Sequence, residues 1–369
     1  MRQDSEKNWT RGAEGKPSHW LMDSHRLRGY GVGFLRTTCA LAGLAALAAL
    51  AACGPIGGVE DDGQGSSGGQ SSAGAPGVVA LPEPPAFKVV GYQPAWAGTF
   101  AGLQFGKLNY INYAFAIEQP DGSVTLPQAT KALIDLVGGA HAAGVRVLLS
   151  VGGWNDGHDG AFNTLSASPV ARANFATVLD GYVDQFQLDG VDIDWEFPEA
   201  DMAQNFTAMM HDLSAKLKPK GKLITIAGAA FYDGAAGVTQ DAMQYIDLVN
   251  IMAYDGNNGP GHSPLTFAQS GLKLWLDKGV PPAKAILGVP FYSQPGYTPY
   301  SMLVAQDPNA ANQDELNKQY YNGIPTVQAK TALAMASAGG IMAWDLSQDS
   351  KKVDISLLSA IYSKSHPGL

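Results

Sequence analysis

The sequence predicts an α/β fold, a (β/α)8 barrel without a large α+β insertion domain, over residues 84–369. Short β-branched runs recur eight times in this region, and each is followed by helix-like or loop sequence. This alternation is typical of parallel strands joined by crossover helices. The alternative is an open doubly wound sheet, which is disfavoured because no Gly-x-Gly-x-x-Gly loop follows the first run. Hydrophobic residues make up 46% of the 369 residues, which is enough for a buried core.

The N-terminal segment, residues 1–53, is expected to be a secretory signal rather than part of the fold. A short apolar run at 40–52 follows three arginines, and a basic stretch before a short apolar one is typical of signal peptides. The run ends in Leu-Ala-Ala-Cys at Cys53, which resembles the bacterial lipoprotein processing box. Cys53 would then become a lipidated N-terminus, whereas the alternative is an ordinary secreted protein cleaved nearby. Met22 is an alternative translation start.

Residues 54–83 are predicted to be a flexible tether between this anchor and the folded part. They are rich in Gly and Ser, and such a composition cannot bury a core. We therefore expect an extracytoplasmic protein that is lipid-anchored at the outer membrane or cell surface, or secreted. The lipid would be its only contact with the membrane.

Charge and cysteine content exclude several classes of partner. The formal net charge is -9, and Lys and Arg are unclustered in the body of the chain, whereas nucleic-acid binding requires a basic stripe. Both cysteines, Cys39 and Cys53, lie in the signal segment, and the seven histidines lack ligand-like spacing. We expect no nucleic-acid partner, no metal, no cofactor and a monomeric chain.

The eight strand candidates stand out by their β-branched content. They are 87–92, 108–115, 145–151, 190–196, 223–229, 246–253, 285–291 and 339–345. Among the segments between them, Ser168-Pro169 predicts a helix start, because Ser is a good N-cap and Pro suits the first helical position. Apolar residues then recur at helical spacing as far as Phe186.

The fourth predicted strand carries the candidate functional residues. Side chains alternate faces along a strand, so Asp192, Asp194 and Glu196 share one face and the apolar residues between them share the other. Active sites of such barrels lie at the C-terminal ends of the strands. Neighbouring carboxylates raise one another's pKa, and a carboxylic acid that stays protonated can protonate a leaving oxygen. The alternatives are a solvated strand end and a divalent-cation site, which would need further oxygen ligands.

Residues 189–196, DGVDIDWE, resemble the DxxDxDxE signature of glycoside hydrolase family 18, the chitinases and their relatives. Three further motifs resemble the family in the same order along the chain. They are SVGGW at 150–154, MAYD at 252–255 and Trp344 on the eighth strand. The resemblance covers about residues 86–362.

This resemblance implies retaining, substrate-assisted endo-hydrolysis of β-1,4-linked N-acetylglucosamine polymers, namely chitin and chitooligosaccharides. Glu196 would protonate the leaving oxygen and later activate water. Asp194 would hold the 2-acetamido N–H, and Asp192 would bond to Asp194, with Ser150 as a supporting donor. Tyr254 would donate its hydroxyl to the acetamido oxygen and fix the attacking geometry.

The same resemblance implies a set of mostly aromatic sugar contacts, because sugar rings have apolar faces that stack on aromatic rings. The set is Tyr92, Phe115, Trp154, Met252, Asp255, Tyr292, Gln294 and Trp344. Trp344 would form the floor of the site, and Asp255 would bind a sugar hydroxyl. Trp96 is either an outer sugar platform or packing at the barrel rim, and Trp275 is expected to be packing.

The chain departs from the family pattern after the seventh strand. Many members have Tyr-Gly-Arg where this chain has Tyr292-Ser293-Gln294, and Gln lacks the charge and the fork of Arg. Only 46 residues separate Tyr292 from Gly339, which leaves little room for the insertion domain that deepens the groove of processive relatives. We therefore expect a shallow, open cleft and endo-type cleavage.

Two other functions remain open. One is endo-β-N-acetylglucosaminidase activity on glycoprotein glycans or peptidoglycan, which would use the same acidic strand. The other is lectin-like chitin binding without hydrolysis. Lectin-like relatives typically lack the acid that Glu196 supplies here.

Overall fold

The computed structural model describes residues 81–98, 100, 102–127, 130–154 and 160–368. The signal segment, Cys53 and most of the predicted tether lie outside the described residues. All elements below belong to the compact unit Ala80–Leu369. Within the described part of the chain, no helix has the length and apolar character needed to cross a membrane.

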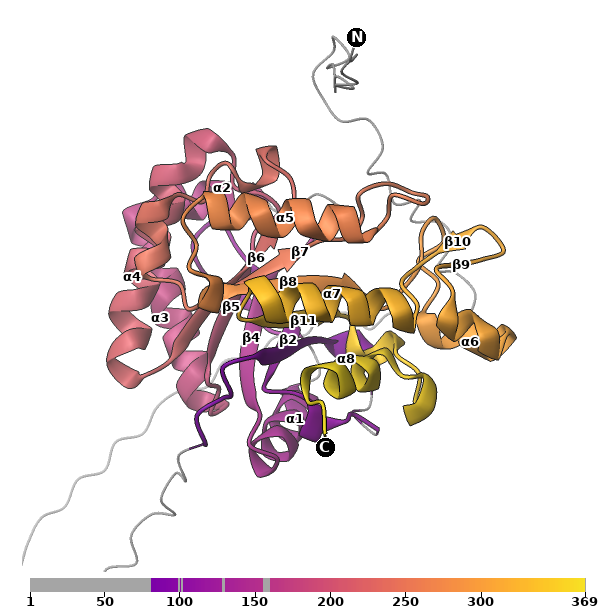
Figure 1. The fold of residues 1–369 in the computed structure, drawn as a ribbon. Coiled ribbons are helices and arrows are strands. Elements are labelled where there is room, and N and C mark those ends of the chain that lie inside the picture. Colours follow the sequence, from indigo (N-terminus) through magenta and orange to yellow (C-terminus); the bar gives the residue numbers. More distant parts are fainter. Residues whose placement is uncertain (1–80, 99, 101, 128–129, 155–159, 369) are drawn as a thin grey trace, which may run out of the picture. The chain divides into compact units, whose positions relative to one another are not determined.

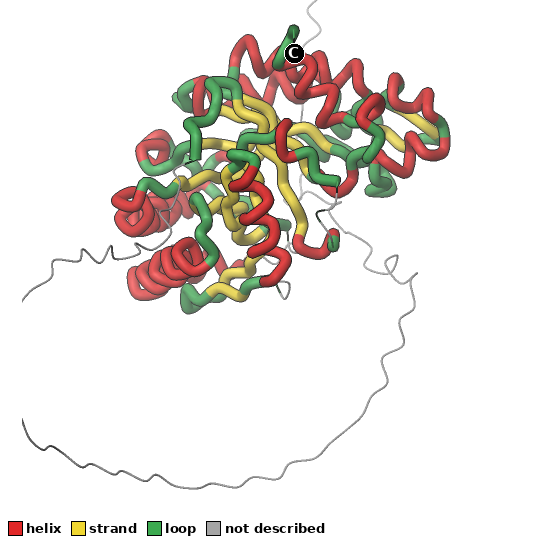
Figure 2. The backbone as a smooth tube through the Cα atoms, turned by 90° about the horizontal axis from the view of Figure 1, so that it is seen from below, coloured by secondary structure: helices red, strands yellow, loops and turns green. Residues whose placement is uncertain are grey.

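Eight parallel strands close into a barrel (Figures 1 and 2). They are β1 (Lys88–Pro94), β2 (Tyr110–Glu118), β4 (Arg146–Gly152), β5 (Gly190–Asp194), β6 (Leu223–Ala229), β7 (Leu248–Met252), β8 (Ala285–Pro290) and β11 (Gly340–Trp344). They pair in chain order, and β1 pairs with both β2 and β11, which closes the sheet. The predicted barrel is confirmed, and the alternative of an open sheet is wrong.

Helices cover the outside of the barrel (Figure 1). They are α1 (Thr130–Ala142), α2 (Gly160–Ala167), α3 (Pro169–Gln185), α4 (Ala203–Leu217), α5 (Leu265–Asp277), α6 (Tyr300–Gln306), α7 (Ile324–Ser337) and α8 (Leu357–Ser365). Short 3-10 turns follow β1 and β6 in place of helices: η1 (Ala95–Ala97), η2 (Phe105–Lys107), η6 (Asp233–Ala235) and η7 (Gln240–Gln244). Other 3-10 turns are η4 (Ala200–Met202), η5 (Lys218–Lys220), η8 (Pro282–Lys284), η9 (Pro308–Asn312), η10 (Leu346–Gln348) and η11 (Val353–Ile355).

Helix α3 begins where the sequence predicts it. The Ser168 side chain accepts a hydrogen bond from the backbone N–H of Ala171 at 3.3 Å, and Pro169 occupies the first helical position. Such a cap stabilises a helix by about 1 kcal/mol. In the apolar stripe of α3, Phe175 and Leu179 are fully buried, whereas Val178 and Tyr182 are partly buried.

Two apolar layers stabilise the barrel, one outside the sheet and one inside it. On β5, Val191 and Ile193 belong to the outer layer between strands and helices. The inner layer is Val90, Tyr92, Tyr110, Ala114, Leu148, Leu248, Ile286 and Met342. Because side chains alternate along a strand, the residue between Val191 and Ile193 points into the barrel. The Asp192 side chain therefore lies inside the barrel.

The connection from β8 to α7 contains more structure than expected. It holds α6, η9 and a small hairpin of β9 (Glu315–Leu316) and β10 (Gln319–Tyr320). A further short strand, β3 (Val124–Thr125), pairs antiparallel with the end of β2. No large α+β domain is present in this described segment between β8 and α7, as predicted.

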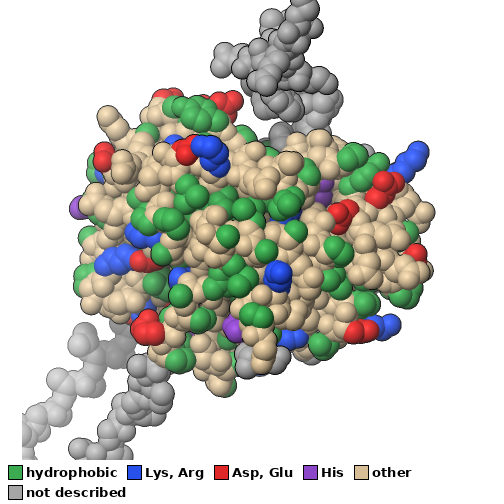
Figure 3. All heavy atoms as spheres, in the orientation of Figure 1, with side chains coloured by type: hydrophobic (Ala, Val, Ile, Leu, Met, Phe, Trp, Pro, Cys, Tyr) green, Lys and Arg blue, Asp and Glu red, His purple; other side chains and the backbone are tan. Residues whose placement is uncertain are grey.

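Acidic and basic side chains are interspersed on the face shown in Figure 3, the side of α5 and α7 in Figure 1. This face carries no basic stripe of the kind that nucleic-acid binding requires.

Candidate active site

The fourth predicted strand ends two residues earlier than expected, which places Glu196 on a bend. The last pairing of β5 toward β4 joins Asp194 to Gly152, where β4 itself ends. The chain beyond Asp194 therefore has no partner strand on that side. Asp192 and Asp194 are 0% and 4% exposed, whereas Glu196 is half-buried. The three acids thus lead from the barrel interior to its rim.

Trp195 anchors this strand end on the outside of the barrel, as predicted. Its ring stacks on Phe162 of α2 with a centroid distance of 5.2 Å and lies 6.0 Å from Phe206 of α4. Burying this large ring between two helices fixes the orientation of the strand end. The neighbouring Asp194 side chain is consequently directed inward.

Two glycines at the end of β4 allow the strand ends to approach closely. Gly152 and Gly153 have φ angles of 105° and 86°, a region that favours glycine. A Cβ atom on Gly152 would lie 2.3 Å from the Asp194 carbonyl oxygen, and one on Gly153 would lie 2.6 Å from the Phe115 ring. The Gly153 N–H donates to the Asp194 carbonyl at 2.8 Å. The SVGGW motif therefore supports the acidic strand directly.

Asp192 accepts hydrogen bonds from four other strands of the barrel. Its Oδ2 accepts from the Tyr92 hydroxyl at 2.8 Å and from Ser150 Oγ at 2.7 Å. Its Oδ1 accepts from Thr225 Oγ1 at 2.5 Å and from Asn250 Nδ2 at 3.2 Å. Burial raises the pKa of Asp192 above its ordinary value, and the four donors oppose this shift. The carboxylate is held rigidly at the barrel centre.

This network differs in part from what the sequence indicates. Tyr92 is predicted to contact sugar, yet it is 2% exposed and its hydroxyl is bound to Asp192, so it lies beneath the site. Ser150 donates to Asp192, in agreement with its predicted role as a supporting donor. Thr225 and Asn250 are absent from the predicted site. Each is a polar residue at an inward position of an apolar strand, and that signal is present in the sequence.

Tyr254 lies beside the acidic strand, just beyond the end of β7. Burial raises the pKa of Tyr254 well above its ordinary value, and the charges of Asp194 and Glu196 raise it further. Its hydroxyl therefore remains a hydrogen-bond donor over the whole neutral range. Gly288 of β8 makes room for the ring, since a Cβ atom there would lie 3.1 Å from Tyr254 Cε1.

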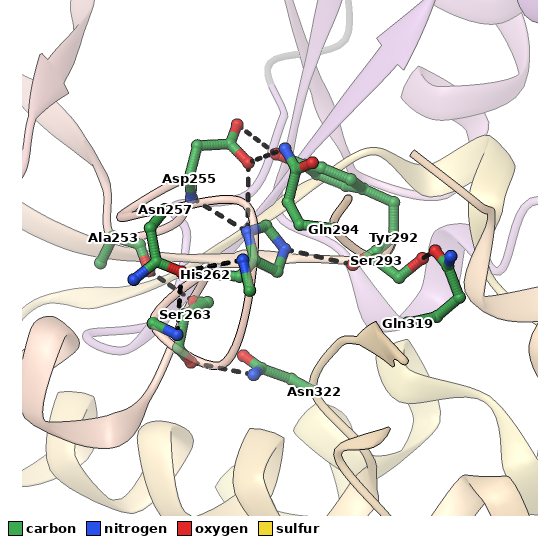
Figure 4. Close-up of polar contacts among 12 residues, drawn as sticks. Ala253, Asp255, Asn257, His262, Ser263, Tyr292, Ser293, Gln294, Gln319 and Asn322 are labelled. Atoms are coloured by element: carbon green, nitrogen blue, oxygen red, sulfur yellow. Dashed lines mark hydrogen bonds and ion pairs between the residues drawn. The ribbon is translucent and has the colours of Figure 1, made fainter. Parts of the chain in front are cut away.

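Asp255 is the centre of a second polar cluster, shown in Figure 4. Its Oδ2 accepts from the Tyr292 hydroxyl at 2.5 Å, and its Oδ1 accepts from Gln294 Nε2 at 2.8 Å. His262 Nδ1 lies 3.1 Å from the same Oδ1. Burial alone would raise the pKa of Asp255, but the contacts with His262, Gln294 and Tyr292 outweigh it and lower the pKa. The side chain stays 23% exposed, so it is accessible from solvent.

Tyr292 and Gln294 lie behind Asp255 rather than at the surface. Both are predicted sugar contacts, but they are 2% and 0% exposed and both donate to Asp255. Their influence on a bound sugar would act through that carboxylate. Tyr297, which is absent from the predicted site, stacks on Tyr292 with a centroid distance of 5.7 Å and is 39% exposed. His262 is also absent from it, because no spacing rule links it to Asp255.

A run of aromatic rings extends from the barrel interior to its edge. Tyr92 meets Trp344 edge-on with centroids 5.5 Å apart, and Phe115 stacks on Trp344 at the same separation. Trp96 continues the run 6.1 Å from Phe115. Since Trp96 is 68% exposed, the alternative of packing at the barrel rim is wrong.

Three other residues named from the sequence are Trp154, Met252 and Trp275. Trp154 and Met252 are half-buried at the C-terminal ends of β4 and β7, on the same side of the barrel as Glu196. Trp275 of α5 is fully buried and donates its indole N–H to the Ala229 carbonyl at 2.8 Å. Trp275 is packing, as predicted.

Comparison with known proteins supports the family resemblance that the sequence motifs indicate. The family described as Glycosyl hydrolases family 18 matches residues 88–349. Chitinase A1 of Niallia circulans is 25% identical over 400 residues, and the match covers 72% of this chain and 57% of that relative. The matches to the curated relatives compared cover 8–58% of the length of those relatives, so this chain spans less than two thirds of each.

Solved structures share the fold. The GH18 chitinase ChiB from the chitin utilization locus of Flavobacterium johnsoniae is 29% identical, with a TM-score of 0.67 over 75% of this chain and 93% of that one. The chitinase-like agglutinin RobpsCRA from Robinia pseudoacacia has a TM-score of 0.68 at 20% identity, over 75% and 99% of the two chains. With a family match that spans the whole barrel sheet, this chain belongs to family 18 of the glycosyl hydrolases.

Proposed function

We propose that this protein is a retaining endo-hydrolase of β-1,4-linked N-acetylglucosamine polymers, with Glu196 as its acid. The observation that carries the proposal is the line of acids from Asp192 through Asp194 to Glu196, which ends at the rim beside Tyr254. The relatives described as chitinases support chitin as the substrate class.

In the first step, Glu196 transfers its proton to the glycosidic oxygen as the bond to the anomeric carbon breaks. The carbonyl oxygen of the substrate's own 2-acetamido group attacks that carbon and forms an oxazolinium ring. The Tyr254 hydroxyl donates to this acetamido oxygen and holds it in the attacking position. Its raised pKa keeps the proton on the hydroxyl.

Asp194 holds the acetamido N–H and stabilises the positive charge that develops on the ring. Asp192, fixed by its four donors, provides a rigid support beneath Asp194. In the second step, Glu196 takes a proton from water as the water attacks the anomeric carbon. The oxazolinium ring opens and the original configuration is restored.

The surrounding residues would bind the sugar chain. Trp344 would lie under the distorted sugar, and the exposed oxygen surface of Asp255 would accept from a hydroxyl. Phe115 and the exposed Trp96 continue the apolar surface away from Trp344, which suits a chain of several sugars.

The test is Glu196→Gln, compared with Glu199→Gln in the same loop. Glu199 is exposed, and its side chain does not cap the following turn. Glu196→Gln should reduce kcat on N-acetylglucosamine oligomers by at least about 100-fold, a typical contribution of a general acid. It should still bind the oligomers, and Glu199→Gln should behave as wild type. Near-native turnover by Glu196→Gln would exclude this mechanism.

The agglutinin named above shows that this fold also occurs in a protein described by its binding. A product profile with chitin oligomers distinguishes the outcomes. Internal cleavage supports the endo-chitinase, and binding without products supports a lectin-like role. Cleavage of high-mannose glycans but not of chitin oligomers supports an endo-β-N-acetylglucosaminidase.

We also propose that Cys53 is lipidated and that the barrel is held outside the cytoplasm by residues 54–83. The proposal is supported by the Leu-Ala-Ala-Cys box at the end of the apolar run and by the Gly/Ser-rich stretch that follows.

A further inference from the structure

Lys330 of α7 is fully buried, and the three groups that accept hydrogen bonds from its ammonium group are uncharged. Its Nζ donates to the Ser263 carbonyl, to Ser263 Oγ and to Asn322 Oδ1, each at 2.6 Å. An ammonium group has three donors, so all of them are used. Burial lowers the pKa of Lys330 to about 7, with the charge of Asp314 opposing the shift. A lysine this costly to bury is expected to have a specific role.

The groups that accept hydrogen bonds from Lys330 lie where the two ends of the 253–263 loop, Ala253 and Ser263, meet. We call this place the neck of the loop. Ser263 Oγ donates to the Ala253 carbonyl at 2.6 Å, which ties the end of the loop to its start. Asn322 Nδ2 donates to the Ser263 carbonyl at 2.9 Å (Figure 4). Lys330 and Asn322 thus fix Ser263, and Ser263 fixes Ala253.

The neck is connected to the candidate active site through His262. His262 Nδ1 lies 3.1 Å from both the backbone nitrogen and Oδ1 of Asp255, and His262 Nε2 lies 3.3 Å from the Tyr292 carbonyl oxygen. The Gly256 N–H donates to the His262 carbonyl at 2.9 Å. Asp255 has a φ of 56°, in the left-handed region that is uncommon for non-glycine residues, although Asp is among those that adopt it most readily. Contacts from Lys330 to Ser263 and from His262 to Asp255 hold both ends of the loop around this residue.

We infer that Lys330 is a positioning residue, which holds the 253–263 loop so that Tyr254 and Asp255 face the bound sugar. The inference rests on the proposed function for its effect on catalysis, whereas its effect on the loop does not. A lysine suits this position because one group satisfies both the carbonyl and the hydroxyl of Ser263. An apolar residue of the same size would remove the Lys330 donor from Asn322 Oδ1 and leave the Ser263 carbonyl with Asn322 Nδ2 as its donor.

The test uses Lys330→Met, with Thr331→Val as the matched control. Both residues are 0% exposed and adjacent on α7, but Thr331 Oγ1 donates to Val327 within the helix. Hydrogen exchange in residues 253–263 should become at least about tenfold faster in Lys330→Met and stay unchanged in Thr331→Val. The kcat on N-acetylglucosamine oligomers should fall by about 10- to 100-fold in Lys330→Met, because small misplacements have effects of this size.

Ser263→Ala provides a second, smaller change that removes the hydroxyl link to Ala253 and keeps Lys330. Like Lys330→Met, Ser263→Ala should speed hydrogen exchange in residues 253–263 and lower kcat. The losses in kcat/KM from Lys330→Met and His262→Asn should also be less than additive in the double variant, because both act on one loop.

Unchanged loop exchange in folded Lys330→Met and Ser263→Ala would overturn the inference. The inference would also be overturned if the losses in kcat/KM were fully additive in the double variant and matched the fraction of unfolded protein in each sample. A wild-type protein that cleaves no oligomer would instead refute the proposed function, and the exchange measurement would still decide whether Lys330 holds the loop.

Discussion

At the residue scale, the buried Asp192 and the half-buried Asp255 have opposite pH dependences. Burial raises the pKa of Asp192, so its contribution to stability is present at low pH and is lost as the pH rises through that raised value. The partners of Asp255 lower its pKa, so its contribution is present at higher pH and is lost on acidification. The difference arises because Asp192 is sealed in the barrel, whereas Asp255 reaches its rim.

Asp255→Asn should therefore destabilise the protein at neutral pH but much less in acid. The expected loss is about 1–3 kcal/mol near pH 7, the usual range for hydrogen bonds to a charged group. The ionised form is favoured above the ordinary pKa of 3.8 and loses its advantage as the pH falls through the lowered pKa. The difference in Tm between wild type and variant, measured from neutral to acid pH, should shrink. Exposed Asp233→Asn is the control, and a difference that grows in acid would contradict the assignment.

At the element scale, the ends of the strands decide the shape of the site. β4 and β5 both end where Gly152 and Asp194 pair, and the chain then turns through two glycines on one side and a bend on the other. A regular strand through residue 196 would have kept Glu196 in line with Asp194. The early end instead brings it to the rim, where a polymer can reach it.

Gly153→Ala should destabilise the barrel, whereas Gly181→Ala should stabilise it. At Gly153 the φ of 86° and the ring of Phe115 both oppose a side chain, for an expected loss of about 1–3 kcal/mol. Gly181 lies inside α3 with open space around it, so alanine should add about 0.5–1 kcal/mol through helix propensity. Urea unfolding of the two variants measures both changes. A neutral Gly153→Ala would contradict the close approach of β4 to Phe115.

At the scale of the whole molecule, the functions proposed for the barrel and for the N-terminal segment are independent of one another. The unit Ala80–Leu369 contains every residue of the candidate site. The proposed anchor, in contrast, depends on a short motif whose last residue is Cys53.

Cys53→Ala should abolish lipidation without affecting hydrolysis. In a Gram-negative host, labelled palmitate should enter the wild-type protein and the control variant Cys39→Ala, but not Cys53→Ala. The kcat of Cys53→Ala on soluble oligomers should equal that of wild type, because Cys53 lies outside the barrel unit. Label retained in Cys53→Ala would refute the anchor.

The sequence by itself determined the barrel, the acidic strand and the start of α3, because these follow from periodicity and capping within one element. Eight apolar runs predict eight strands, and alternation along residues 190–194 separates Asp192 and Asp194 from Val191 and Ile193. Trp344 and the glycines at the end of β4, Gly152 and Gly153, were readable as motifs.

Only the tertiary structure decided which residues meet. The partners of Asp192 lie 33 to 100 residues away in the chain, and barrel closure alone brings them together. Burial, which no local pattern specifies, places Tyr92, Tyr292 and Gln294 beneath the site and leaves Trp96 exposed. The same holds for Lys330, whose contacts with Ser263 span 67 residues. Periodicity describes the faces of one strand or helix, whereas hydrogen-bond partners depend on how those faces are packed against one another.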